Sequence, residues 1–409
     1  MFARLSRSQP TISRNARHFS LSGARRESSS GSNGPLIGIT VVSLEQTIAA
    51  PFCTRQLADL GARVIKVERP GVGDFARSYD TRGKGLASHF VWTNRSKESL
   101  ALDVKKPADH EALMRLLSKA DVLVQNLAPG ASARSGLSFN ALKESHPRLI
   151  VCDISGYGQD GPYRDKEAYD LLVQSEAGML SVTGTGKEPA KVGISIADIA
   201  SAMYAYSNIL AALLQRSKTG RGSHIDISML ECMAEWMGFP MYYAYDGAPG
   251  PVPAGASHAS IYPYGLFETG DGQSVMLGIQ NEREWANFSS RVLAQPNLAT
   301  DARFSNIICE SFAGITAEEA TRRLDEAGIA NANVNDMHGV WEHAQLRARK
   351  RWAEVQTPEG PVASLLPPGF TPSSDGSEKV RPRMDPIPNV GEHNESILAE
   401  LGISTHGDE

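Results

Sequence analysis

Residues 36–70 read LIGITVVSLEQTIAAPFCTRQLADLGARVIKVERP, and this stretch decides the fold. Its first part, 37–44, is rich in β-branched residues and predicts a buried strand. Pro51 stands where the first turn of a helix tolerates proline, and Gly61 follows the last apolar residue, so we predict a helix over 52–60. A second β-branched run, 63–67, predicts the next strand. Strand, helix, strand is the repeating unit of a parallel sheet.

The same alternation continues as far as residue 228. Helical patterns begin at Pro107 and cover 195–215, and further strands are predicted at 100–104, 121–124, 148–154 and 225–228. This order predicts an α/β fold with a Rossmann-like large domain, whose mostly parallel sheet carries helices on both faces.

The pattern changes after residue 228. Residues 229–270 are aromatic and rich in Pro and Gly, which predicts an excursion into a second, smaller α+β domain. We place the first part of the large domain at 33–228, the smaller domain at 229–339 and a C-terminal segment at 340–409.

Residues 1–32 form a separate leader. They contain six Arg and a single acid, Glu27, and they are rich in Ser. This composition predicts a mitochondrial targeting peptide followed by a flexible linker, and hence a location in the mitochondrial matrix. A disordered basic tail is the alternative.

The charge balance excludes some classes of partner. The formal net charge is −5, and beyond residue 32 there are 35 basic against 45 acidic residues. A nucleic-acid backbone or an anionic membrane surface needs a basic face, so we expect neither as a partner. No apolar run reaches the roughly 18–20 residues of a bilayer span, so we expect a soluble protein.

The cysteines predict neither a metal site nor a disulfide framework. Cys53, Cys152, Cys232 and Cys309 are scattered, without a C-x-x-C pair or a His at ligand spacing. We therefore expect no metal and a reducing compartment.

The sequence GYGQDG at 156–161 matches the dinucleotide fingerprint G-x-G-x-x-G and follows a predicted strand. The fingerprint binds a pyrophosphate only if a helix begins directly behind it, and here the polar stretch PYRDK follows. We interpret this motif, and the similar GVGD at 71–74, as tight turns.

Asp170 begins the apolar helical run of 170–178. It is either an acid that interacts favourably with the helix dipole or a nucleophile, and the two interpretations are compatible because the same N–H groups keep a carboxylate ionised. Polar residues also follow the predicted strands: Arg69, Lys97, Asn126 and Arg134. Cations at this edge of an open α/β sheet could bind a nucleotide's phosphates, although each is individually more often a solvated surface charge.

A series of motifs resembles the class III CoA-transferases of the CaiB/BaiF type. The matching stretches are LIGITVVSLE at 36–45, LGARVIKVERP at 60–70, NRSK at 94–97, Asn126 with PG at 129–130, GYG at 156–158, YD at 169–170, KTGRG at 218–222 and GEH at 391–393. The resemblance covers nearly the whole chain from about residue 35 to 402.

This resemblance implies a ring-shaped subunit and an interlocked homodimer. The large domain is built from both chain ends, so residues 340–409 are expected to return to it. The resemblance implies no permanently bound cofactor, with a coenzyme A thioester and a carboxylic acid as substrates. Asp170 would attack the acyl-CoA to give a mixed anhydride and then an aspartyl-CoA thioester.

The resemblance also implies roles for other residues. The expected contacts to CoA and its thioester are Gln46, Ala49, Arg69, Lys97, Asn126 and Arg134, and the substrate side is expected to include Tyr157, Tyr169 and His258. Together with mitochondrial import, the resemblance suggests succinyl-CoA as donor and glutarate, itaconate or mesaconate as acceptor. Arg77, Arg82 or His258 could then bind the distal carboxylate.

Two departures from the family pattern stand out. Glu98 replaces a usual basic residue, which is expected to weaken CoA contacts locally. The segment that follows DARF at 301–304 is shorter than in relatives, between Asn306 and Ile307, which is expected to affect the packing of the smaller domain.

Three other functions remain open. The same fold carries α-methylacyl-CoA racemases, in which a His precedes the aspartate; here that residue is Tyr169, a poor base, with a second acid at Asp198. A nicotinamide oxidoreductase would rest on the glycine motifs alone. A CoA-binding scaffold without catalysis would retain its function without Asp170.

Overall fold

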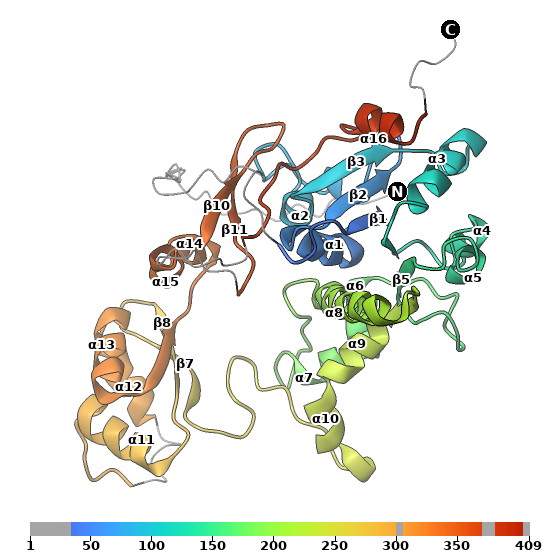
Figure 1. The fold of residues 1–409 in the computed structure, drawn as a ribbon. Coiled ribbons are helices and arrows are strands. Elements are labelled where there is room, and N and C mark those ends of the chain that lie inside the picture. Colours follow the sequence, from blue (N-terminus) through green and yellow to red (C-terminus); the bar gives the residue numbers. More distant parts are fainter. Residues whose placement is uncertain (1–33, 300–305, 370–380, 404–409) are drawn as a thin grey trace, which may run out of the picture.

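The large domain is built on one parallel sheet. The computed structural model describes residues 34–299, 306–369 and 381–403. Its main sheet has six strands in the order β3-β2-β1-β4-β5-β6, and every pairing is parallel (Figure 1). The strands are β1 (Thr40–Leu44), β2 (Arg63–Glu68), β3 (Lys97–Ala101), β4 (Val122–Gln125), β5 (Ile150–Ser155) and β6 (His224–Ser228). The predicted Rossmann-like α/β fold is confirmed.

Helices cover both faces of this sheet because its strands are apolar on both sides. Val41 and Val64 face one core, and the next residues along, Val42 and Ile65, face the other. The helices of this part are α1 (Ala49–Asp59), η2 (Phe75–Ser78), α2 (Ser88–Thr93), α3 (Pro107–Leu117), α4 (Ala131–Arg134), α5 (Phe139–Leu142), α6 (Asp170–Glu176), α7 (Met179–Val182), α8 (Ile196–Thr219) and α9 (Met229–Trp236). The first core lies under α1, α8 and α9, and the second under α3.

Helix α8 is the longest helix of the described residues. It is also the one described helix that is long and apolar enough to cross a membrane by length and composition. In the structure it packs on α1, and Ala197, Ala200 and Ile209 are buried in the first core. Its apolar surface is therefore used at least partly for internal packing.

The smaller domain has an antiparallel sheet of its own. Its elements are β7 (Tyr264–Glu268), β8 (Ser274–Gly278), α11 (Glu282–Asn287), η4 (Phe288–Val292), α12 (Ile307–Ala313), α13 (Ala317–Ala327) and β9 (Ala330–Asn333). Helix α12 begins directly after Asn306, and its Ile308 and Phe312 are buried in the domain's core. Residues 301–304, just before the shortened segment, lie outside the described residues. Helix α12, which follows this segment, packs on the core of the smaller domain.

The large domain extends beyond the predicted boundary at residue 228. Met229, Cys232 and Met233 of α9 belong to the first core, so this helix is part of the large domain. The sequence boundary was wrong because the aromatic composition of 229–270 begins one helix before the chain leaves the core. The chain then continues through α10 (Gly238–Tyr243) and η3 (Tyr245–Gly247).

The C-terminal part returns to the large domain. It contains α14 (Met337–Trp341), α15 (Ala344–Ala348), the hairpin β10 (Trp352–Val355) and β11 (Val362–Leu365), and α16 (Asn394–Glu400). Ile397 of α16 is buried in the second core, and His393 N–H donates to the Ser99 carbonyl at 3.0 Å. This segment therefore covers the edge strand β3.

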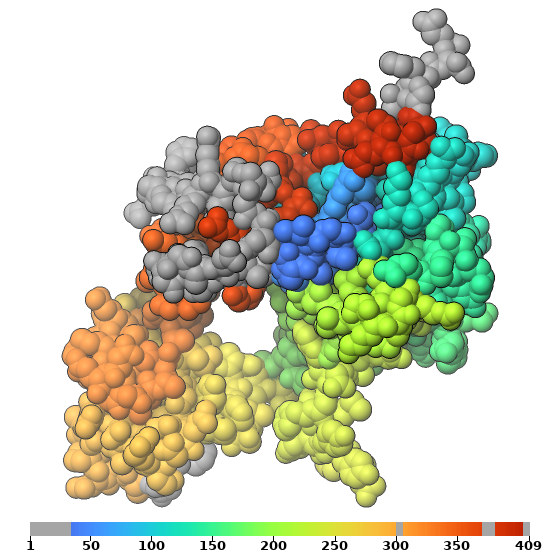
Figure 2. All heavy atoms as spheres, viewed as in Figure 1, coloured from blue at the N-terminus to red at the C-terminus, as the bar shows by residue number. Residues whose placement is uncertain are grey.

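The subunit encloses an opening. Figure 2 shows a space that passes through the molecule between the large domain (blue and green) and the smaller domain (yellow and orange). The chain leaves the large domain along one side of this space and returns to it along the other (Figure 1).

Candidate active site

The carboxylate of Asp170 is held by hydrogen bonds to both of its oxygens. Oδ1 accepts the backbone N–H of Ala197 at 2.8 Å and that of Asp198 at 3.4 Å. Oδ2 accepts the side-chain amide of Gln174 at 2.7 Å. Because Ala197 and Asp198 lie in the first turn of the 24-residue helix α8, the carboxylate sits at the positive end of a long helix. Donors from two helices, α8 and α6, therefore fix both oxygens of this carboxylate.

Asp170 acts as the cap of α8 from another element. The N-cap residue of α8 is Ser195, but its own side chain makes no capping hydrogen bond. The Asp170 carboxylate takes the N–H groups that a capping side chain would normally accept. The strand-to-helix connection that precedes α6 therefore places this carboxylate where α8 needs an acceptor.

Gln174 fixes the second oxygen of Asp170. It lies one turn further along α6 and is fully buried, and its Oε1 accepts the Val192 N–H at 3.0 Å. This bond orients the amide, so that its NH₂ group faces Asp170. Gln174 was not predicted from the sequence, although its spacing of four residues from Asp170 on one helix was an available signal.

Asp198 is a second carboxyl group beside Asp170. Burial and, to a smaller extent, the charge of Asp170 raise the pKa of Asp198 to about 7, although a hydrogen bond from the Ala49 N–H acts in the opposite direction. Ala49 is the first residue of α1. The N-termini of α1 and α8 therefore meet at this pair of carboxyl groups.

The loop at 46–49 lies at the switch point of the sheet, where β1 and β4 are neighbours and the strand order reverses. Gln46 N–H donates to Asn126 Oδ1 at 2.9 Å, and Asn126 Nδ2 donates back to the Gln46 carbonyl at 2.9 Å. Ligands of open α/β sheets bind outside the carboxyl ends of the strands at this point. Of the predicted residues, the structure thus brings Gln46, Ala49 and Asn126 together, and Ala49 reaches Asp170 through Asp198.

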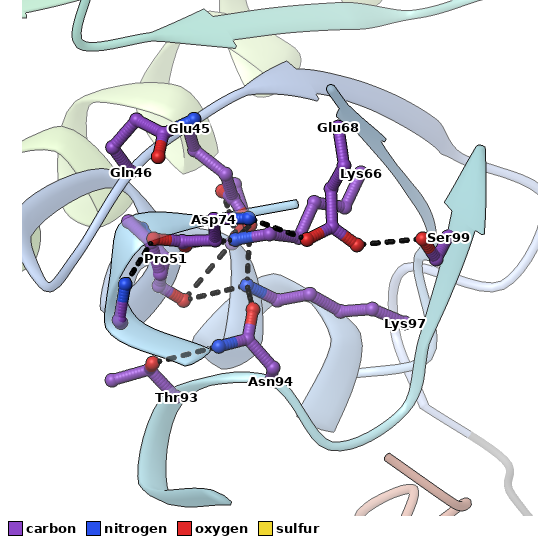
Figure 3. A network of polar contacts seen from close by, with 12 residues as sticks. Glu45, Gln46, Pro51, Lys66, Glu68, Asp74, Thr93, Asn94, Lys97 and Ser99 are labelled. Atoms are coloured by element: carbon purple, nitrogen blue, oxygen red, sulfur yellow. Dashed lines mark hydrogen bonds and ion pairs between the residues drawn. The ribbon is translucent and has the colours of Figure 1, made fainter. Parts of the chain in front are cut away.

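A buried charge network supports this loop (Figure 3). It consists of Glu45, Lys66, Asp74 and Lys97, whose side chains are fully buried. Lys66 Nζ lies 2.6 Å from Asp74 Oδ2 and 3.3 Å from Glu45 Oε1, and Lys97 Nζ lies 2.7 Å from Glu45 Oε1. Each charge is compensated, as a buried charge requires.

Asp74 of the network also bonds to the loop backbone, and the next residue, Phe75, bonds to a loop side chain. Asp74 Oδ1 accepts the Thr47 N–H at 2.9 Å, and the Phe75 N–H donates to Gln46 Oε1 at 3.0 Å. Thr47 has a φ of 64°, which a threonine rarely adopts unless its surroundings hold it there. The loop at 46–49 is therefore fixed both by the buried charge network and by Asn126.

The predicted contact between Lys97 and the CoA nucleotide does not agree with this structure. The three donors of Lys97 are used by Glu45, by the Pro51 carbonyl at 2.9 Å and by Asn94 Oδ1 at 3.2 Å. Strand β3 begins at residue 97, three residues before the predicted start, so Lys97 lies inside the sheet region. Burial lowers the pKa of Lys97 to about 8, and the charge of Glu45 opposes this effect.

The two predicted arginines lie at the surface. Arg69 directly follows β2, and its guanidinium lies 4.6 Å from the centre of the Phe75 ring. Arg134 ends the short helix α4, and both side chains are exposed. These cations are accessible to a ligand.

The predicted substrate residues lie in two places. Tyr169 directly precedes Asp170 and is 74% exposed, and Tyr157 lies edge-on to Tyr163, with ring centres 5.3 Å apart. His258 belongs to the smaller-domain side: its ring stacks on Tyr264 at 5.3 Å, and its Nδ1 accepts the Ile261 N–H at 3.0 Å.

Two further sequence interpretations can be compared with the structure. Glu98 pairs with Arg63 at 2.7 Å, and Arg63 also binds Glu400 of α16, so the charge of Glu98 is compensated by a cation. After β5 the GYGQDG motif forms turns, with Gly158 and Gly161 at positive φ, and the next helix begins only at Asp170. The interpretation as turns is confirmed.

Comparisons with known proteins define the family. The model of CoA-transferase family III matches residues 36–394. The human succinyl-CoA:glutarate CoA-transferase is 30% identical, over 90% of this chain and 86% of the relative. The succinyl-CoA:mesaconate CoA-transferase of Haloarcula marismortui is 30% identical, over 91% of this chain and 98% of the relative.

A solved structure agrees with these matches. A CaiB/BaiF family protein from Brucella suis superposes with a TM-score of 0.79, at 31% identity, over 90% of this chain and all of that one. The sheet order gives the α/β fold, and the family model and the named relatives show an enzyme of the transferase type. The chain belongs to CoA-transferase family III, whose substrates are CoA thioesters.

Proposed function

We propose that this enzyme transfers CoA from succinyl-CoA to a dicarboxylic acid, with Asp170 as the nucleophile. The observation that carries the proposal is the position of Asp170, whose carboxylate is held by hydrogen bonds from the first turn of α8 and from Gln174, next to the switch-point loop. A carboxylate nucleophile must be fixed in direction, and these hydrogen bonds fix both of its oxygens.

The reaction proceeds by exchange of carbonyl bonds without net proton transfer. An Asp170 oxygen attacks the thioester carbonyl, and the C–S bond of the tetrahedral intermediate breaks, so that CoA leaves as a thiolate and a mixed anhydride of Asp170 and succinate remains. The thiolate attacks the Asp170 carbonyl, which gives an aspartyl-CoA thioester and releases succinate. The acceptor carboxylate then attacks this thioester, and the thiolate returns to the acceptor's carbonyl, which regenerates Asp170.

The choice of substrates rests on the relatives. One acts on succinyl-CoA and glutarate and another on succinyl-CoA and mesaconate, by their names. We propose glutarate, mesaconate or itaconate as acceptor. Arg77 is an unsuitable partner for the distal carboxylate because its guanidinium already binds Glu68 at 2.8 Å and 2.9 Å, which favours Arg82 or His258.

The test measures CoA exchange by the full chain. Protein is incubated with succinyl-CoA and a panel of mono- and dicarboxylic acids, and the acyl-CoA products are identified by mass spectrometry. We expect a new dicarboxylyl-CoA and free succinate with the wild type and neither with Asp170→Asn, which keeps the size of the side chain. Exchange in the variant would overturn the role of Asp170, and a preference for monocarboxylates would overturn the acceptor.

We also propose an interlocked homodimer. The supporting features are the opening through the subunit (Figure 2) and a projecting aromatic segment, residues 236–245, which runs from the end of α9 into η3. Its exposed side chains are Trp236, Phe239, Tyr242, Tyr243 and Tyr245, of which Tyr242 is 79% exposed. Apolar side chains clustered in this way usually contact a partner.

We propose import into the mitochondrial matrix on the basis of residues 1–32, which lie outside the described residues. A fluorescent protein fused behind residues 1–34 should co-localise with a matrix marker, and the same fusion with the six arginines changed to Gln should not.

One observation favours the racemase as a second candidate. Asp198, with its pKa raised to about 7, could exchange a proton with the α-carbon of an acyl-CoA. Incubation of 2-methylacyl-CoA in D₂O separates the two functions, because a racemase incorporates deuterium at the α-carbon without any acceptor acid.

A further inference from the structure

The two oxygens of Asp170 are bound by different kinds of donor. Oδ1 accepts two backbone N–H groups from the first turn of α8, while Oδ2 accepts a single side-chain amide from Gln174. The two backbone donors are part of helix α8 and cannot move unless it unwinds, whereas Oδ2 depends on one side chain, which the Val192 N–H orients. This difference has a chemical meaning if Asp170 is the nucleophile, so the inference rests on the proposed function.

We propose that Oδ1 is the oxygen that Asp170 retains in the aspartyl-CoA intermediate, and that the first turn of α8 is the oxyanion hole for the Asp170 carbonyl. Oδ2 is then the attacking oxygen. Gln174 is a positioning residue that holds Oδ2 toward the substrate before the attack.

The bonds of the transfer are consistent with this assignment. Oδ2 forms the bridge of the anhydride when it bonds to the succinyl carbonyl and CoA leaves as thiolate. The thiolate sulfur then bonds to Cγ of Asp170, and the electron pair of the C=O bond moves onto Oδ1. When this pair returns, the bond between Cγ and Oδ2 breaks, and succinate leaves with Oδ2 as one of its carboxylate oxygens.

The second half of the reaction uses the same hole. The acceptor carboxylate attacks Cγ of the aspartyl thioester, so the negative charge again develops on Oδ1 before the thiolate leaves. The thiolate finally attacks the acceptor's carbonyl, and the bridging oxygen remains on Asp170 as the new Oδ2. Both tetrahedral states at Cγ thus place their charge in front of Ala197 N–H and Asp198 N–H.

The reverse assignment would leave buried donors without acceptors. If Oδ1 departed, two backbone N–H groups of α8 would face a sulfur atom, which is a weak acceptor, and the helix dipole would act on no developing charge. If Oδ2 departs, a single side-chain donor, the amide of Gln174, loses its acceptor instead of two backbone N–H groups. The helix terminus therefore favours retention of Oδ1.

The test observes the carbonyl of the intermediate directly. Full-length protein that contains [4-¹³C]aspartate is loaded with succinyl-CoA, freed of succinate, and checked by intact mass for the gain of one CoA less one water. The ¹³C thioester carbonyl band is then measured by difference infrared spectroscopy in the folded adduct and in the same adduct after acid denaturation. An oxyanion hole polarises the carbonyl, so the folded band should lie at lower frequency.

Gln174→Met distinguishes the two oxygens. This variant keeps the length of the side chain and removes its polar atoms. We expect the folded band to stay at the wild-type frequency, while kcat falls roughly tenfold because Oδ2 is no longer positioned and KM for succinyl-CoA changes less than twofold. Gln215→Met, at the exposed far end of α8, is the matched control.

Each outcome decides one point. A folded band at the frequency of the denatured adduct would overturn the oxyanion hole, and this result needs only the wild type. A band that moves up in Gln174→Met would show that the retained oxygen faces Gln174 and would overturn the assignment. If no CoA adduct forms on Asp170, the proposed function itself fails, and the inference fails with it.

Discussion

Asp198 carries the clearest pH dependence of any single residue in the site. Its pKa of about 7 lies well above the 3.8 of an unperturbed Asp, because it is buried beside Asp170. Between pH 4 and pH 7 the folded protein therefore holds a proton that the unfolded chain has released. Stability then falls as the pH rises through this interval, and it is lowest above pH 7.

Asp198→Asn should remove this dependence, because an amide is neutral at every pH. We expect the variant's thermal midpoint to exceed that of the wild type by more at pH 8 than at pH 5. Differential scanning fluorimetry at both pH values measures this difference, with Asp160→Asn on the exposed loop as control. A constant difference between the two pH values would contradict the raised pKa.

Lys97 and Arg69 should behave in opposite ways when they are replaced. Lys97→Met leaves Glu45 with fewer cations inside the protein, and breaking a buried ion pair typically costs about 3–5 kcal/mol. Arg69→Met removes an exposed cation, so it should raise KM for succinyl-CoA without changing stability. Urea unfolding and steady-state kinetics of both variants test this. A stable Lys97→Met with a raised KM would restore the nucleotide role.

Single residues show where sequence reasoning stops. Asp170 and Asn126 could be chosen because each stands at a recognisable position, a helix start or the end of a strand. From the sequence, Lys97 and Arg69 had the same expected role at the end of the sheet. Strand β3 begins three residues earlier than predicted, so the ammonium of Lys97 lies in the core and not at the surface. Gln174 was missed because its role depends on Val192, which is brought close only by the folded chain.

At the scale of elements, the switch-point loop connects stability to catalysis. The loop at 46–49 is fixed by Asn126 from β4 and by the buried charge network from β1, β2 and β3. The element pattern in residues 36–70 predicted the strand and helix on each side of this loop. The pattern did not predict what holds the loop, because its supports come from segments up to 80 residues away.

Asn126→Ala should loosen this loop. The variant loses both hydrogen bonds to Gln46, so we expect a loss of about 1–3 kcal/mol in unfolding free energy. We also expect a lower kcat, because Ala49 N–H no longer holds Asp198 in place. Asn126→Asp keeps the acceptor for Gln46 N–H and should lie between wild type and Ala in stability. A change confined to KM would instead mean that Asn126 contacts CoA and does not position the loop.

At the scale of the whole molecule, the mostly parallel sheet and the existence of a smaller domain followed from composition and alternation. The opening through the subunit did not, since it depends on how two distant parts of the chain are placed. The resemblance to the family had implied a ring, and Figure 2 agrees with that shape.

The proposed dimer should depend on the projecting aromatic segment. Phe239 and Tyr243 lie edge-on to each other with ring centres 5.8 Å apart, and both are exposed in the single subunit. Replacing both with Ser should lower the mass seen by light scattering from two subunits to one without lowering the stability of the isolated subunit. A wild-type protein that is monomeric at micromolar concentration would contradict the interlocked dimer.

The C-terminal segment that covers β3 is synthesised long after the strand itself. Strand β3 is the edge of the sheet. The Ser99 N–H donates a hydrogen bond to Nδ1 of His393, which lies 294 residues later in the chain. An unpaired edge strand invites pairing with other chains. At a synthesis rate of about 5–20 residues per second, the nascent chain carries this open edge for roughly 15–60 s. This edge therefore stays open to pairing with other chains until the segment around His393 has been synthesised.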